Sequence, residues 1–219
     1  MLKKLMKSLQ PEEPVLPPEL ESDPIAKAAD WGARKQGGAS FKTHRLERES
    51  PQRWLFKATA VAKLFYAIFL IVGISIAIGF TYAMWQDADQ ERDATLLFPL
   101  LMGAAFATIG GTMLVFGTRP IVFDKTIGWH WKGHRKPTDV FDTNELKQAV
   151  KLEEIHALQL IREYVPGGRN SSGYYSYELN LILKDSSRLN LVDHGNLEDL
   201  INDGQALAEF LGIPLYRSV

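Results

Sequence analysis

The chain has 219 residues, a formal net charge of −1 and a hydrophobic fraction of 46%. That length allows one modest soluble domain beside a short membrane segment, and the near-neutral charge gives no overall basic character that would favour a nucleic-acid partner. The chain contains no cysteine, which excludes disulfides, thiolate metal sites and cysteine nucleophiles.

The first 60 residues are polar, and we expect them to form a largely disordered amino-terminal segment. Residues 10–24 contain five prolines and five acidic side chains, a composition typical of an extended linker. Residues 41–46 are more compatible with a strand, and they could join a sheet formed later in the chain.

Two apolar runs follow, at residues 64–85 and 96–118, and neither contains a charged side chain. Each is long enough to cross a hydrocarbon core of about 30 Å as a helix. We therefore predict a transmembrane hairpin over residues 61–118, with helices at about 62–86 and 95–118. Because no Asp, Glu, Lys, Arg or His lies within the spans, a transporter or pump acting alone is not expected.

The charges beside the spans predict their orientation. The loop at residues 86–93 holds one basic and four acidic residues, whereas six Lys or Arg residues precede the first span and five follow the second. These basic residues are Lys42, Arg45, Arg48, Arg53, Lys57 and Lys63, then Arg119, Lys125, Lys132, Arg135 and Lys136. By the positive-inside rule, both termini are expected in the cytoplasm, as in a multi-pass protein of the bacterial inner membrane.

Small residues recur at four-residue spacing in both spans. Gly103, Ala107 and Gly111 make one such row, and Gly73 and Ala77 make another. Small side chains at this spacing let helices approach closely in lipid. They predict helix packing, either within the hairpin or against a second copy or another membrane protein.

Residues 119–219 are expected to form a cytoplasmic α+β domain. Alternating or β-rich segments predict several antiparallel strands, and the apolar stripe of residues 197–211 predicts one amphipathic helix that caps them. Asn196 is a good N-cap for this helix, and Gly212 and Pro214 end it. The predicted strands are residues 120–124, 127–132, 155–165, 175–183 and 188–192, although residues 153–162 are also compatible with a helix.

This organisation resembles that of bacterial membrane proteins with a pleckstrin-homology-like (PH-like) domain. The residues that carry the resemblance are 121–124, 152–155, 177–181 and the helix 197–211. The resemblance implies a binding or assembly module with no catalytic residues. That fold has seven strands and only five are clear here, so residues 133–150 or the segment around Phe41 would supply the others, and a simpler α+β sandwich is the alternative.

No catalytic, metal or cofactor site is predicted from the remaining motifs. His130 and His134 lie four residues apart, but Gly133 between them argues against a helix that would bring them together. The pair Asp193 and His194 lacks a nucleophile in a recognisable motif. Surface histidines are the simpler interpretation.

Two groups of side chains are candidates for binding a lipid or a partner. Arg162, Arg169, Lys184 and Arg188 could form a basic rim around the loop at residues 166–173, where anionic headgroups would bind. The aromatic side chains Trp129, Trp131, Tyr174, Tyr175 and Tyr177 are most simply core, and any exposed members could contact a partner. The sequence therefore predicts a non-enzymatic, membrane-anchored binding or assembly subunit, with a lipid-sensing module or a subunit of a membrane enzyme as alternatives.

Overall fold

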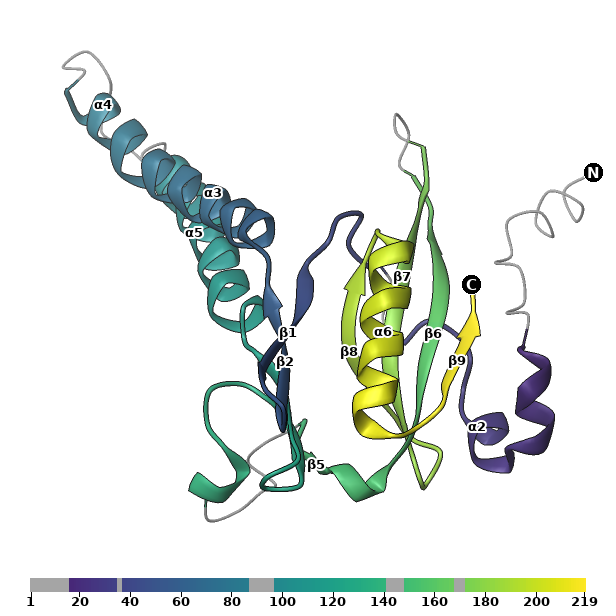
Figure 1. The fold of residues 1–219 in the computed structure, drawn as a ribbon. Coiled ribbons are helices and arrows are strands. Elements are labelled where there is room, and N and C mark those ends of the chain that lie inside the picture. Colours follow the sequence, from purple (N-terminus) through teal and green to yellow (C-terminus); the bar gives the residue numbers. More distant parts are fainter. Residues whose placement is uncertain (1–15, 35–36, 87–96, 141–147, 168–171) are drawn as a thin grey trace, which may run out of the picture. The chain divides into compact units, whose positions relative to one another are not determined.

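The computed structural model describes residues 16–34, 37–86, 97–140, 148–167 and 172–219 (Figure 1). They form two compact units, one within residues 57–120 and the other within residues 1–56 and 121–219. The smaller unit is therefore an insertion between two parts of the larger one. The predicted domain of residues 119–219 gains a contribution from the chain that precedes the apolar runs.

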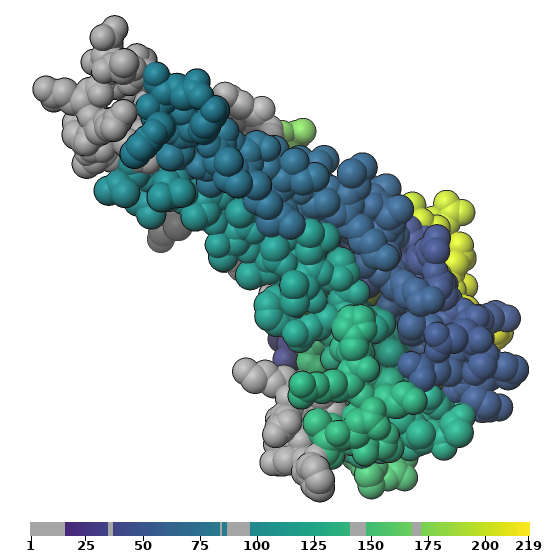
Figure 2. Space-filling model, turned by 90° about the vertical axis from the view of Figure 1, so that its left-hand side faces the viewer, coloured from purple at the N-terminus to yellow at the C-terminus, as the bar shows by residue number. Residues whose placement is uncertain are grey.

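The smaller unit is a hairpin of two apolar helices. The first comprises α3 (Ala60–Ser75), the π-helical turn η2 (Ile76–Phe80) and α4 (Thr81–Gln86), and the second is α5 (Leu97–Gly117). The two helices contact each other, in blue and teal in Figure 2. Residues 60–83 and 97–117 are each long and apolar enough to span a membrane. Except for Gln86, the predicted acidic loop at residues 86–93 lies outside the described residues.

One sheet of the larger unit combines strands that precede the hairpin in the sequence with strands that follow it. Its order is β1-β2-β3-β4-β5, and β2 pairs antiparallel with β3, β3 with β4, and β4 with β5. The strands are β1 (His44–Ser50), β2 (Arg53–Ala58), β3 (Ile121–Asp124), β4 (Trp129–Lys132) and β5 (Val150–Lys151). A short 3₁₀ turn, η4 (Pro137–Asp139), lies between β4 and β5.

The second sheet has the order β8-β7-β6-β9. It follows the 3₁₀ turn η6 (Leu152–Glu154) and comprises β6 (Ile155–Val165), β7 (Tyr174–Leu183), β8 (Arg188–His194) and β9 (Leu215–Ser218). Helix α6 (Leu197–Leu211) connects β8 to β9, with Asn196 as its N-cap and Gly212 in the left-handed region at φ 76°. The expectation of a purely antiparallel sheet ended by a helix is corrected, because β9 follows α6 and pairs parallel to β6.

The two sheets share one apolar core with α6. Leu158, Leu160, Leu179 and Leu181 from the second sheet are fully buried in it. Trp54, Phe56, Ile121 and Phe123 from the first sheet belong to the same cluster. The Trp54 ring stacks on Phe210 of α6 with ring centroids 4.6 Å apart. The structure is therefore a mixed α+β protein with two sheets, which is the coarse form of the predicted fold class.

The described part of the amino-terminal segment, from residue 16 on, has more defined structure than predicted. It contains the 3₁₀ turn η1 (Pro18–Ser22) and the short helix α2 (Pro24–Ala28) before β1 begins. Leu20 and Trp31 are buried with Ala157, Ile161 and Ile182 of the second sheet. Its proline-rich composition favours disorder in isolation, but its few apolar side chains become buried on a sheet face that the local sequence does not reveal.

Candidate functional site

The two faces of the second sheet differ chemically, because side chains alternate along each strand. One face presents leucines to the shared core with α6. The other face carries polar side chains, which lie beneath the amino-terminal segment, and several of them are fully buried. They are Gln159, Glu163, Ser176, Glu178, Asn180, Arg188 and Asn190.

These polar side chains bind the backbone of the amino-terminal segment. Gln159 Nε2 donates to the Asp30 carbonyl at 3.0 Å, and the backbone N–H of Arg34 donates to Glu178 Oε2 at 2.9 Å. Burial raises the pKa of Glu178, and the hydrogen bond from the Arg34 N–H acts in the opposite direction. Such side-chain contacts satisfy backbone groups that have no partner in a ladder.

Arg188 belongs to this internal network and not to a surface rim. Its guanidinium donates to the Gly32 carbonyl at 2.9 Å, to Gln159 Oε1 at 3.1 Å and to Asp30 Oδ2 at 2.7 Å, and the residue is only 9% exposed. The predicted basic rim is corrected at this position, because the guanidinium is used inside the fold.

A second polar contact holds the start of α2. Asp23 Oδ1 accepts hydrogen bonds from the backbone N–H groups of Ile25 and Ala26, and Asp23 Oδ2 lies 2.7 Å from both His156 Nε2 and the Tyr216 hydroxyl. Burial opposes ionisation of Asp23, but these hydrogen bonds outweigh it and lower its pKa to about 2. Asp23 therefore joins the amino-terminal segment to both β6 and β9.

Strands β6 and β7 are longer than their neighbours β8 and β9, and their ends continue as a two-stranded ribbon. The pairing of β9 ends opposite Ile161 and that of β8 ends opposite Tyr177, whereas β6 and β7 stay paired as far as Val165 and Tyr174. The ribbon extends past the neighbouring strands in Figure 1. Its pairs Glu163–Ser176 and Val165–Tyr174 face one side, and Tyr164–Tyr175 faces the other.

One face of this ribbon carries two exposed tyrosines and an arginine beside them. We call Arg162, Tyr164 and Tyr175 the tyrosine patch. Tyr164 and Tyr175 are 51% and 46% exposed, and their ring centroids lie 5.3 Å apart. The Arg162 guanidinium carbon lies 5.0 Å from the centroid of the Tyr175 ring, within cation–π range. The patch thus combines exposed aromatic surface, a positive charge and a defined geometry.

The other predicted binding residues do not join this patch. Lys184 follows the far end of β7, about 20 Å along the strand from Tyr177, the partner of Arg162. Arg169 lies outside the described residues. Tyr177 packs against the core, and Trp129 and Trp131 belong to the first sheet. The interpretation of the sequence did not include Tyr164. A hairpin centred on the loop at residues 166–173 would pair Tyr164 with Tyr175, so this signal was present in the sequence.

Three of the five histidines, His44, His130 and His194, are buried, and His156 is paired with Asp23. Within the parts of the chain that the structure describes, no group of three or more His, Cys, Asp or Glu residues is arranged to hold a metal ion. Burial lowers the pKa of His130 to about 3 and those of His44 and His194 to about 4. The expectation of surface histidines is corrected for these three, whereas His134 is exposed.

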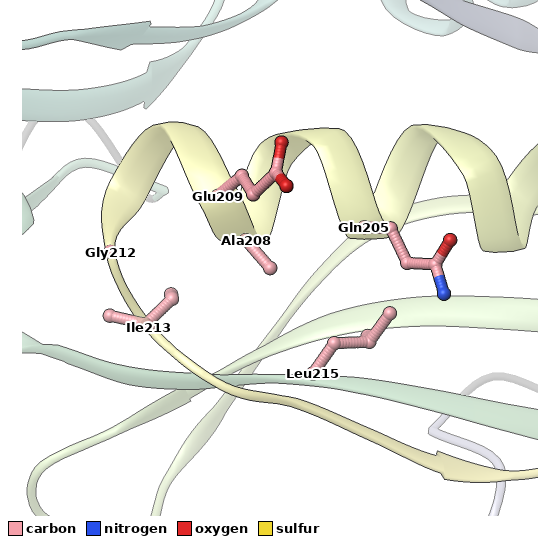
Figure 3. Close-up of a pocket in the computed structure, with 6 residues that line it drawn as sticks. All are labelled: Gln205, Ala208, Glu209, Gly212, Ile213 and Leu215. Atoms are coloured by element: carbon pink, nitrogen blue, oxygen red, sulfur yellow. The ribbon is translucent and has the colours of Figure 1, made fainter.

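Two depressions lie beside β9. The first, of about 440 Å³, lies between the end of α6 and the start of β9, and Gln205, Ala208, Gly212, Ile213 and Leu215 line it with Glu209 (Figure 3). The second, of about 640 Å³, lies between residues 16–22 and 214–219. Neither contains a convergent set of acid, base and nucleophile, so neither carries a catalytic assignment.

The predicted small residues of the spans lie mainly between the two helices of the hairpin. An added Cβ at Gly73 would overlap the backbone N of Ala107, and one at Gly103 would overlap that of Ala77. Gly110, not Gly111, makes the third close contact, with the backbone of Leu70, while the nearest atom to a Cβ at Gly111 is a Leu70 methyl carbon 4.0 Å away. This row of small residues is therefore used within the hairpin.

Comparisons with protein-family models, with curated proteins and with solved structures found no match for this chain. We therefore infer a function from the side chains of the chain itself.

Proposed function

We propose that the chain is a non-enzymatic, membrane-anchored binding module, an accessory or assembly subunit of a membrane protein complex. Its contact with a protein partner is the tyrosine patch. The observation that carries the proposal is that Tyr164 and Tyr175 are half exposed and lie in contact with each other, with the Arg162 guanidinium over the Tyr175 ring. Tyrosine and arginine are enriched at the centres of protein interfaces, and a tyrosine side chain loses little conformational entropy on binding because it has only two χ angles.

The membrane anchor in this proposal is the apolar hairpin. Large apolar side chains cover its outer surface, with Phe98 70% and Ile78 67% exposed, as expected for helices that face lipid. We place both termini in the cytoplasm of a bacterial cell, with the loop between the spans outside, because the flanking basic residues far outnumber those in the loop. A reporter at residue 90 should be accessible from the periplasm and one at residue 219 should not. Equal accessibility of the two would contradict the orientation.

A photo-crosslinking amino acid at position 164 tests the partner contact. In intact cells we expect one predominant crosslinked membrane protein, which co-purifies with the unmodified chain in mild detergent. Co-purification should fall at least about tenfold in the variant Tyr164→Ser/Tyr175→Ser, since paired aromatic hot spots often contribute more than 2 kcal/mol. Lys184→Ser is the matched control, because this exposed residue lies at the other end of β7.

The same variants separate a protein partner from a lipid surface. If the patch bound lipid, sedimentation with vesicles containing anionic phospholipid would depend on Arg162, and the crosslinks from position 164 would be to lipid. That outcome would contradict the proposed protein contact. Arg188 contributes little to a lipid site in either case, because its guanidinium is engaged with Asp30, Gln159 and Gly32.

The resemblance to PH-like membrane proteins stays a prediction. It agrees with the proposed role, since it implies a binding or assembly module. Two sheets and a helix near the end of the chain are compatible with it, whereas the parallel strand β9 after α6 is a departure from the expected helical ending. A solved structure of the chain in detergent would decide between a PH-like domain and a different α+β arrangement.

A further inference from the structure

The ribbon that carries the tyrosine patch is held from behind by three residues of the amino-terminal segment. The backbone N–H groups of Gly37 and Gly38 donate to the two carboxylate oxygens of Glu163, at 2.9 and 3.4 Å. In return, the Tyr174 hydroxyl donates to the Gly38 carbonyl at 2.8 Å and the Ser176 hydroxyl to the Ala39 carbonyl at 3.1 Å. Both strands of the ribbon are thus bound to one short stretch of backbone.

These contacts lie directly behind the patch. Glu163 and Ser176 are opposite each other in the β6–β7 register, and the next pair along the ribbon is Tyr164 and Tyr175. Because side chains alternate along a strand, the first pair faces the amino-terminal segment and the second faces away from it. A two-stranded ribbon by itself is marginally stable in water, so contacts on its back determine how well its front is ordered.

The close approach requires glycine at position 38. A Cβ there would overlap Ser176 Oγ, lie 2.8 Å from Ser176 Cβ and lie 3.3 Å from Glu163 Oε2. The Ser176 hydroxyl could rotate away, but its Cβ could not move without shifting the ribbon. Gly32, six residues earlier in the same segment, is different, because the nearest atom to its added Cβ is Asp30 Oδ1 at an ordinary 3.4 Å.

We propose that residues 37–39 are the positioning element of the tyrosine patch, so that the state of the amino-terminal segment regulates partner binding. This inference rests on the proposed function, because it supposes that the patch is the binding surface. Gly38 and Glu163 are positioning residues that face away from the patch and act through the backbone of the ribbon. A partner or modification that displaces residues 37–39 would loosen the patch and weaken its binding.

Hydrogen exchange of the full chain in lipid nanodiscs tests the inference without any partner. In Gly38→Ala, we expect the ribbon amides of residues 163–165 and 174–176 to exchange about tenfold faster, while α6 and β3 keep their rates. Gly32→Ala is the matched control, with the same chemical change and unchanged ribbon exchange. Glu163→Gln should accelerate the same amides about threefold, because it weakens the contact with Gly37 and Gly38 without adding volume.

Two results would overturn the inference. One is unchanged ribbon exchange in both Gly38→Ala and Glu163→Gln. The other is an equal acceleration throughout β6, β7 and α6, which would indicate general destabilisation in place of a local brace. Failure of the proposed function would look different, since the ribbon would respond to Gly38→Ala while co-purification of the crosslinked protein stayed independent of Tyr164 and Tyr175.

Discussion

The two faces of the four-stranded sheet are both buried, but different interactions bury them. On one side, leucines of β6, β7 and β8 pack beneath the amphipathic helix α6. On the other side, a smaller apolar cluster of β6 and β7 packs against Leu20 and Trp31, and polar side chains bind the backbone of an amino-terminal segment that has little regular structure. The apolar face gains stability from burial in proportion to area, whereas the polar face depends on particular pairs of donors and acceptors and so specifies one chain path.

The largest expected effect comes from two adjacent residues that point to opposite faces, Leu179 and Asn180, both fully buried. We expect Leu179→Ala to lower the free energy of unfolding by about 4 kcal/mol, because it leaves a cavity under α6. Asn180→Ala should cost about 1–2 kcal/mol, because its neighbour Gln159 Oε1 still accepts from Arg188. Denaturant unfolding of the full chain in detergent, followed by tryptophan fluorescence, measures both. Equal costs would remove the distinction between the faces.

Lowering the pH tests whether the edge of the apolar core can accommodate a protonated histidine. His194 is fully buried where β8 meets α6, its Nδ1 accepts from the Asn196 N–H, and its Nε2 has no hydrogen-bond partner among the described residues. Burial, followed by repulsion from Lys42, lowers its pKa from 6.5 to about 4. The unfolded chain therefore binds more protons than the folded chain between these values, and stability falls as pH falls from about 6.5 to about 4.

This histidine should account for about 3 kcal/mol of the stability lost between pH 7 and pH 4. The measurement compares the pH dependence of unfolding in the natural chain and in His194→Gln. The contribution of His130 cancels in this comparison, whereas His44 loses in the variant the repulsion from His194 that helps to lower its pKa. The raised pKa values of Glu178 and Asp203 act in the opposite sense and also cancel in the difference. Identical pH profiles would show that His194 is solvated.

The smallest expected effects concern the helix caps on the two sides. Asn196 caps α6 through one hydrogen bond to the Asp199 N–H, whereas Asp23 caps α2 and also binds His156 and Tyr216. Asn196→Ala should therefore cost about 1 kcal/mol and Asp23→Ala about 2 kcal/mol. Limited proteolysis should cut residues 24–34 faster only in Asp23→Ala. Equal cleavage in both variants would indicate that helix α6 and the amino-terminal segment, which cover the two faces of the second sheet, unfold together.

Much of the apolar side of the molecule was predictable from the sequence. Helix α6 occupies the predicted residues 197–211, with Asn196 and Gly212 at its ends, because an apolar stripe and its capping residues are local signals. Strand β7 was predictable from alternation for the same reason, whereas the first part of β6 was compatible with either a strand or a helix. The polar face was not predictable from the sequence. Polar residues such as Gln159, Glu178 and Arg188 normally indicate a solvent-exposed face, and only the tertiary structure places the amino-terminal segment over them.

The sequence by itself determined the two apolar helices, strands β7 and β8 and the helix that covers their sheet, because the number and spacing of apolar residues within one element encode each of them. Only the tertiary structure decided that residues 16–56 complete the larger unit, that Arg188 is internal, and that Arg162 joins Tyr164 and Tyr175 on one face of a ribbon. Those outcomes depend on pairing between distant segments. The chemical type of a side chain limits the contacts that it can make, and the neighbouring residues in the tertiary structure determine which of these contacts it makes.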